Sequence, residues 1–257
     1  MMEDLIFARG NRTPVYYRFR KGRSDCNHLL IVMSGFNIPD PTIYDFDKIL
    51  EYCDSHILWV KDEYNGLPAY YFCNNMSFDI ELGVSTLIEG VRKFLNDPTV
   101  SILGASKGGS ASLYYGIKHK IPRIITAVPQ FNIGTYVAEG TYWQHVGKEM
   151  MGEFSQENIN RLNNKLPNIL KMNEFTNNHI YLFTSPTDAQ FQNEIQPNLS
   201  LFSRYKNFNL IISKSPKITQ HNQVTLYNVK LILSLLYQFE SGINPLWGNI
   251  RNGSDWN

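Results

Sequence analysis

The sequence has few cysteines, almost no net charge and no cluster of metal-binding side chains. Its three cysteines, Cys26, Cys53 and Cys73, are odd in number and widely spaced, which argues against a disulfide framework and indicates reduced thiols in a cytoplasmic protein. A net charge of +1 predicts no nucleic acid or other polyanion held by bulk electrostatics. The six histidines show no ligand spacing with one another or with cysteine, so we expect no structural metal.

Long hydrophobic runs are also missing. The longest apolar stretch, residues 231–237, falls far short of the roughly 18 residues that a membrane helix needs. The first residues lack the apolar region of a secretory signal. We therefore expect a protein with no integral membrane segment. Whether it forms a homo-oligomer is left open by the sequence.

The rest of the chain is organised around one turn, at residues 100–110. The apolar run from Val100 to Leu103 predicts a buried strand, and the Ala- and Leu-rich segment after residue 109 predicts a helix. Between them Gly104, Ser106 and Gly108 form a G-x-S-x-G pattern, which is typical of a nucleophile elbow in this strand–turn–helix context. Side chains at the two glycine positions would collide with the strand and the helix. The alternative is a tight turn in which the serine only caps the helix.

Strands and helices alternate along most of the chain, which predicts an α/β fold with a mostly parallel, doubly wound sheet. We expect one domain over residues 1–257. The alternation breaks at residues 130–178, which we interpret as a small cap inserted after the sixth strand, and the Asn- and Gly-rich tail is expected to be loosely held. The expected strands are residues 5–8, 15–19, 28–33, 56–60, 100–103, 123–128, 179–184 and 208–213, and the main helices are residues 80–95, the segment after 109, and 222–240.

A serine hydroxyl needs a general base and an orienting carboxylate to act as a nucleophile. Asp188 follows the strand at 179–184, and His221 follows the strand at 208–213, directly before the last helix. Alone, an aspartate here could cap a turn and a histidine could be a surface residue. Because both lie at the carboxyl ends of strands and in the order Ser, Asp, His, we predict the catalytic triad Ser106–Asp188–His221.

The oxyanion hole requires two N–H donors aimed at a carbonyl oxygen. The first candidate is the main-chain amide of Lys107, the residue after the serine, and its side chain is expected to face solvent. The second candidate is a main-chain N–H of the loop after the strand at 28–33. Phe36 is the first choice for this donor and Asn37 the second.

The SGFN loop at 34–37, the GASKGG elbow, SPTDAQF around the acid and TQHNQV around the base resemble the α/β-hydrolase superfamily over most of the chain. Within it, the loop and elbow resemble bacterial capsular-polysaccharide O-acetyltransferases of hydrolase type, and accessory-secretion glycan acetyltransferases are similar too. The resemblance implies a three-layer α/β-hydrolase fold and ping-pong chemistry, with acetyl-CoA as acetyl donor and a polysaccharide hydroxyl as acceptor. The sequence of the oxyanion loop differs from that of many lipases, because it begins with Ser-Gly where theirs begins with His-Gly.

Aromatic residues supply candidate substrate contacts: Tyr70, Tyr142 and Trp143 could stack on sugar rings or simply belong to the core. A carboxylesterase or thioesterase would use the same triad, since water in place of an alcohol turns transfer into hydrolysis. The alternative that is not an enzyme is a binding protein that has a hydrolase fold but no catalytic activity. The sequence does not identify the acceptor glycan or the position acetylated.

Overall fold

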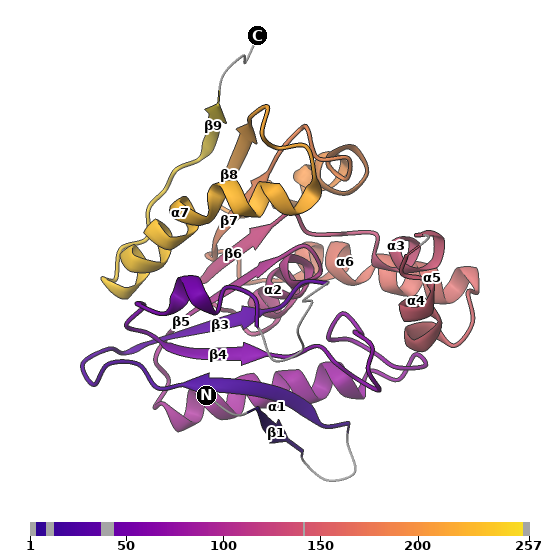
Figure 1. Ribbon diagram of the computed structural model, residues 1–257, viewed down its shortest axis with the longest axis horizontal. Coiled ribbons are helices and arrows are strands. Elements are labelled where there is room, and N and C mark those ends of the chain that lie inside the picture. The colour runs from indigo at the N-terminus through magenta and orange to yellow at the C-terminus, as the bar shows by residue number, and fades with distance from the viewer. Residues whose placement is uncertain (1–3, 9–12, 37–43, 141, 254–257) are drawn as a thin grey trace.

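A nine-stranded sheet forms the centre of the computed structural model, which describes residues 4–8, 13–36, 44–140 and 142–253. The strand order is β1-β2-β4-β3-β5-β6-β7-β8-β9 (Figure 1). Pairing is antiparallel from β1 to β2 and from β2 to β4, and parallel between all other neighbours, so the predicted mostly parallel sheet is confirmed. The strands are β1 (Leu5–Phe7), β2 (Val15–Arg20), β3 (His28–Met33), β4 (His56–Val60), β5 (Thr99–Ala105), β6 (Arg123–Ala127), β7 (His179–Thr184), β8 (Asn207–Lys214) and β9 (Asn249–Gly253).

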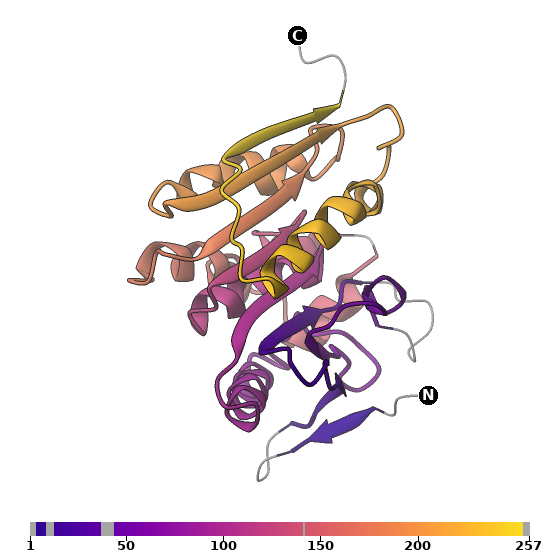
Figure 2. The same ribbon diagram turned by 90° about the vertical axis from the view of Figure 1, so that its left-hand side faces the viewer.

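Helices cover both faces of the sheet, as a strand that is apolar throughout requires. Alternate residues of β3 enter opposite cores: Leu29 and Ile31 pack in the core with α1 (Asp79–Phe94) and α2 (Lys107–Lys118), whereas Leu30 and Val32 pack in the core with α7 (His221–Glu240). Figure 2 shows α7 on one side of the sheet and α1 on the other. The result is three layers, helix–sheet–helix.

The segment 130–178 that interrupts the strand–helix alternation contains four short helices after β6. They lie together at one end of the molecule (Figure 1), next to the carboxyl ends of the central strands. The first of them packs on the second and the third, and the fourth packs mainly on α2. The helices are α3 (Ile133–Glu139), α4 (Gln144–Met151), α5 (Gln156–Asn163) and α6 (Lys165–Met172). Elsewhere in the described residues there are three short helical turns: η1 (Lys48–Leu50), η2 (Phe191–Ile195) and η3 (Gln196–Phe202).

The expectation of a loosely held tail is wrong for residues up to 253. There β9 adds to the sheet in parallel with β8. Asn209 Oδ1 accepts the N–H groups of Trp247 and Gly248 at 2.6 and 3.0 Å, and the Trp247 ring packs against Tyr181 with 5.6 Å between centroids. These anchors lie on β7 and β8, so the local composition of the tail gave no sign of them.

Candidate active site

Ser106 occupies the sharp turn between β5 and α2, with φ 55° and ψ −124°. A residue other than glycine in this region carries about 1–3 kcal/mol of strain, which the surrounding structure must hold in place. A Cβ added to Gly104 would lie 2.0 Å from the carbonyl oxygen of Gly108, and one added to Gly108 would lie 2.1 Å from that of Met33. Both predicted glycine requirements are confirmed. The Ser106 side chain makes no capping hydrogen bond to α2, so the capping alternative does not apply.

The structure brings the three predicted triad residues into one hydrogen-bonded chain. The Ser106 Oγ lies 2.9 Å from His221 Nε2, and His221 Nδ1 lies 2.8 Å from Asp188 Oδ2. Asp188 follows β7 and is only 3% exposed, and its second carboxylate oxygen accepts the main-chain N–H of Gln190 at 3.0 Å. This arrangement holds the imidazole with Nδ1 toward the carboxylate and Nε2 toward the serine, which is what proton transfer from Oγ requires.

The start of α7 is fixed by its own cap, and this places His221. The Gln223 side-chain oxygen accepts the N–H groups of Thr219 and Gln220 at 2.7 and 3.0 Å, so the helix begins at His221. Two other histidines lie elsewhere: His119 caps the far end of α2, and His179 begins β7 at the end opposite to Asp188.

The loop after β3 lies against the elbow. A Cβ added to Gly35 would lie 4.0 Å from Ser106 Cβ. The Gly35 N–H donates to the partly buried Asp45 carboxylate at 2.6 Å, so this amide is already occupied. The next amide, of Phe36, remains the candidate donor beside that of Lys107. Burial raises the pKa of Asp45, and the Gly35 bond partly offsets this effect. The reserve candidate, Asn37, lies outside the described residues.

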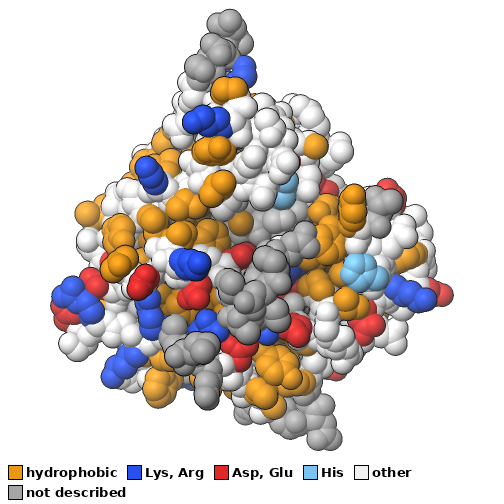
Figure 3. Space-filling model, viewed as in Figure 1, with side chains coloured by type: hydrophobic (Ala, Val, Ile, Leu, Met, Phe, Trp, Pro, Cys, Tyr) orange, Lys and Arg blue, Asp and Glu red, His pale blue; other side chains and the backbone are white. Residues whose placement is uncertain are grey.

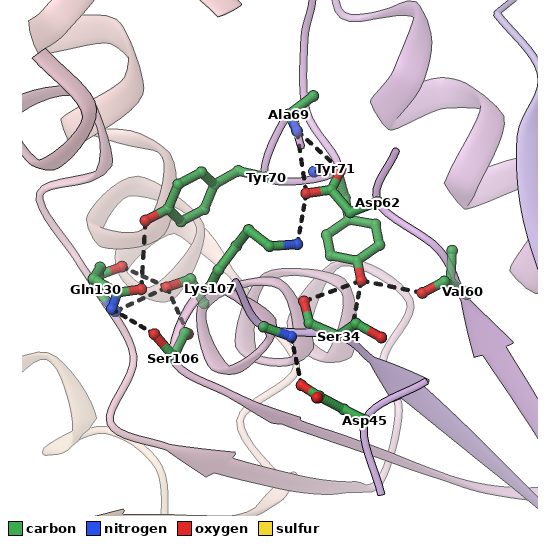
Figure 4. A network of polar contacts seen from close by, with 12 residues as sticks. Ser34, Asp45, Val60, Asp62, Ala69, Tyr70, Tyr71, Ser106, Lys107 and Gln130 are labelled. Atoms are coloured by element: carbon green, nitrogen blue, oxygen red, sulfur yellow. Dashed lines mark hydrogen bonds and ion pairs between the residues drawn. The ribbon is translucent and has the colours of Figure 1, made fainter. Parts of the chain in front are cut away.

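The expectation that the Lys107 side chain faces solvent is wrong. It is 1% exposed, and its Nζ lies 2.6 Å from Asp62 Oδ2 and 4.5 Å from the centre of the Tyr71 ring. The Tyr71 hydroxyl in turn accepts the N–H of Ser34 at 2.6 Å and donates toward the Ser34 and Val60 carbonyl oxygens (Figure 4). Burial lowers the pKa of the Lys107 ammonium, although Asp62 acts to raise it. The Lys107 side chain therefore packs beneath Tyr71, which is hydrogen-bonded to the start of the loop after β3.

Ser106 and His221 open into a cavity of about 1060 Å³. Trp143 stacks on Phe36 at 4.1 Å between ring centroids and forms one wall, and Tyr142 is 82% exposed at the rim. The prediction that Tyr70 contacts a sugar is wrong. Its side chain is fully buried beneath Phe36 and cannot stack on a substrate. The cavity is lined by Gly35, Phe36, Asp45, Phe46, Ile49, Ala105, Ser106, Val128, Tyr136, Tyr142, Trp143, His145, Gln190, Gln220, His221, Asn222, Thr225, Leu226 and Val229.

The surface beside this cavity is partly apolar. Hydrophobic side chains gather over α7 on the face shown in Figure 3. Exposed large apolar residues of this helix are Leu226, Tyr227 and Tyr237. No helix in the described part of the chain combines the length and apolar character needed to cross a bilayer. Within the same described ranges, no three His, Cys, Asp or Glu residues group as a metal site.

Sequence reasoning missed Gln130, Gln190 and Asp62. Gln130 Nε2 lies 2.9 Å from Ser106 Oγ and 2.9 Å from Gln190 Oε1, and Asp62 pairs with Lys107. One signal was present: Gln130 and Asp62 follow the buried strands β6 and β4 within a few residues, at the edge of the sheet where the triad lies.

No protein-family model matches the sequence, and no curated protein sequence matches it. Solved structures do match. The capsule O-acetyltransferase of Neisseria meningitidis serogroup A superposes with a TM-score of 0.72 at 17% identity, over 92% of this chain and 94% of that one. A mutant of that enzyme in complex with CoA gives a TM-score of 0.68 at 16% identity, over 90% and 98%.

Est1E from Butyrivibrio proteoclasticus gives a TM-score of 0.63 at 10% identity, over 93% of this chain and 98% of that one. At these identities the likeness concerns the fold. With the layers, strand order and elbow described above, it identifies the three-layer fold that the sequence predicted: the chain has the α/β-hydrolase fold.

Proposed function

We propose that this protein is a serine acyl-transfer enzyme with the triad Ser106–Asp188–His221. The observation that carries the proposal is the continuous hydrogen-bonded chain from Ser106 Oγ through both imidazole nitrogens to Asp188, with contacts of 2.9 and 2.8 Å. The strained elbow and the open cavity above it support the same conclusion, because they present the hydroxyl to a substrate.

In the first half-reaction, Ser106 Oγ attacks the acyl carbon while its proton passes to His221 Nε2. The amides of Lys107 and Phe36 donate to the carbonyl oxygen as it gains negative charge. The leaving group departs with the proton held by His221, and an acyl-serine remains. In the second half-reaction an acceptor hydroxyl gives its proton to His221, attacks the acyl carbon and releases Ser106.

We propose acetyl-CoA as the donor and a polysaccharide hydroxyl, such as one on a bacterial capsule, as the acceptor. The fold likeness to a capsule O-acetyltransferase, one form of which is solved with CoA, supports this choice. The cavity of about 1060 Å³ is at the upper end of small-molecule sites, so it has room for two substrates. Trp143 and Tyr142 offer ring faces for a sugar. We place the activity in the cytoplasm, where acetyl-CoA is available.

Hydrolysis is the second candidate function, and a specific observation favours it. The His221 side chain is 24% exposed and lines the open cavity, so water can reach the nitrogen that would activate it. An esterase or thioesterase with the same triad would give free acid in place of transfer. The likeness to Est1E is in keeping with either outcome. A non-catalytic binding protein would need neither of the two triad contacts.

Two measurements separate these functions. Incubation of the protein with acetyl-CoA and capsular polysaccharides, with O-acetyl product scored against free acetate, is expected to show transfer. Ser106→Ala should abolish it, whereas Ser203→Ala, at an exposed position, should not. Free acetate alone would identify a hydrolase. Failure of a fluorophosphonate probe to label Ser106 would favour the binding protein.

A further inference from the structure

The side chain of Gln130 lies against the nucleophile and is completely buried. Its Nε2 lies 2.9 Å from Ser106 Oγ and 2.9 Å from Gln190 Oε1, so each of its two N–H groups has an oxygen acceptor. Its Oε1 accepts the Tyr70 hydroxyl at 3.4 Å (Figure 4). Burial raises the pKa of Tyr70 well above its usual value, which keeps the phenol protonated as a donor. The amide is therefore held with its nitrogen toward the serine.

The main chain of Gln130 is clamped in place. Its N–H donates to Ser110 Oγ at 2.8 Å, and Ser110 Oγ donates to its carbonyl oxygen at 2.7 Å. Two residues earlier, Val128 has φ 42°, a conformation that a β-branched side chain rarely adopts. Strain of this kind persists only where neighbouring contacts enforce it.

The residues after Gln130 are held by a buried carboxylate. Glu194 Oε2 accepts the N–H groups of Phe131 and Asn132 at 2.6 and 2.8 Å. Glu194 lies on η2, close after Asp188, so the segment that carries the acid also holds the segment that carries Gln130. The position of the amide relative to the triad is therefore fixed from both sides.

The sheet order shows which atom the amide addresses. Ser106 directly follows β5, which lies between β3 and β6. The oxyanion loop follows β3, and Gln130 follows β6, so the two approach the serine from opposite sides. Gln130 Nε2 also lies 3.5 Å from His221 Nε2. The side-chain amide of Gln130 thus faces Oγ and the histidine, on the side of the serine opposite to the loop that carries the candidate amide of Phe36.

We propose that Gln130 is a further catalytic residue, whose side-chain amide donates a hydrogen bond that stabilises negative charge on Ser106 Oγ in both half-reactions. The proposal rests on the proposed role of Ser106 as nucleophile. During acylation the O–H bond of Ser106 breaks, its proton moves to His221 Nε2, and the Oγ–carbon bond forms. During deacylation that bond breaks, its electron pair stays on Oγ, and Oγ takes the proton from His221. Gln130 loses no proton in either step.

The test is Gln130→Met, which keeps the length of the side chain and removes the donor. Burst kinetics with 4-nitrophenyl acetate give the acylation and deacylation rate constants separately. Both should fall about 10- to 100-fold, the effect of losing a hydrogen bond to a charged group, with substrate affinity little changed. The melting temperature should fall as well, because the buried Tyr70 hydroxyl loses its acceptor. Gln156→Met, at an exposed glutamine of α5, is the matched control and should match the wild type.

A second variant decides the matter if Gln130→Met does not fold. Gln130→Glu keeps the size and replaces the donor by an acceptor, so it should also be at least about 10-fold slower. Wild-type rates in either folded variant, with Ser106→Ala inactive, overturn the role of Gln130 and leave the serine mechanism standing. Wild-type rates in Ser106→Ala overturn both.

Discussion

Asp62→Asn should destabilise the protein strongly although it keeps the size of the side chain. Asp62 and Lys107 have side chains that are both 1% exposed, with 2.6 Å between Oδ2 and Nζ. Asp62 also accepts the main-chain N–H groups of Ala69 and Tyr71, the latter at 2.9 Å. Asparagine would keep the shape and leave a buried ammonium without its counter-charge.

Removing one partner of a buried ion pair costs about 3–5 kcal/mol. For a chain of this size, each kcal/mol lowers the melting temperature by roughly 2–4 °C, so the expected drop is about 6–20 °C. The Tyr71 ring, whose centre lies 4.5 Å from the ammonium, compensates part of the loss and favours the lower end of the range.

The loss should also depend on pH. Burial lowers the pKa of Lys107 in the folded protein, and Asp62 acts to raise it, so Asp62→Asn lowers it further. Between this folded-state pKa and the ordinary lysine pKa, the unfolded chain binds more protons than the folded one. Stability of the variant therefore rises with pH in that window, and its deficit should be smaller at pH 9 than at pH 7.

Urea unfolding followed by tryptophan fluorescence measures these differences. The double variant Asp62→Asn/Lys107→Met removes both charges and should recover at least half of the deficit. Asp25→Asn, in an exposed pair with Arg23, is the matched control and should leave the unfolding midpoint unchanged. The reasoning is refuted if Asp62→Asn unfolds within about 1 kcal/mol of the wild type, or if the double variant is no more stable than the single one.

Three further predictions concern other parts of the structure. Asp188→Asn should lower kcat with 4-nitrophenyl acetate by about 10³- to 10⁴-fold, because the imidazole loses its orienting acceptor, and a loss under tenfold would contradict this. Burial lowers the pKa of His28 to about 3, so the folded state resists protonation and the free energy of unfolding should fall as the pH drops below 6.5, by about 3 kcal/mol at pH 4.5. His28→Gln should weaken this dependence of the unfolding free energy on pH, as measured by urea titrations at several pH values. An unchanged dependence would mean that other groups cause it. Gly108→Ala should destabilise the protein by about 3 kcal/mol or more, since its Cβ would meet the Met33 carbonyl at 2.1 Å, and a melting temperature equal to that of the wild type would exclude the clash.

Local sequence determined eight of the nine strands described in the sheet, β9 being the exception, and the outline of the candidate site. Strands buried on both faces must be apolar throughout, so runs such as HLLIVM at β3 and HIYLFT at β7 could be recognised without any partner. The elbow could be recognised from its G-x-S-x-G pattern between a strand and a helix, and the clash that Gly104 avoids is local, with the carbonyl oxygen of Gly108. The clash that Gly108 avoids is with Met33 on β3, a neighbour that the tertiary structure supplies. Since parallel strands end at one edge, positions directly after them, such as Asp188 and His221, could be expected to meet.

Only the tertiary structure decided which side chains contact one another across the sheet. Lys107 is buried because Asp62, 45 residues earlier, lies beneath the elbow, and nothing in the composition around either residue indicates the pair. Tyr70 is covered by Phe36, and Gln130 reaches Ser106 because β6 lies beside β5. The physical reason is the same in each case: burial and hydrogen bonding of these side chains depend on neighbours that the fold supplies, while the apolar strands and the elbow pattern are written in residues that are adjacent along the chain.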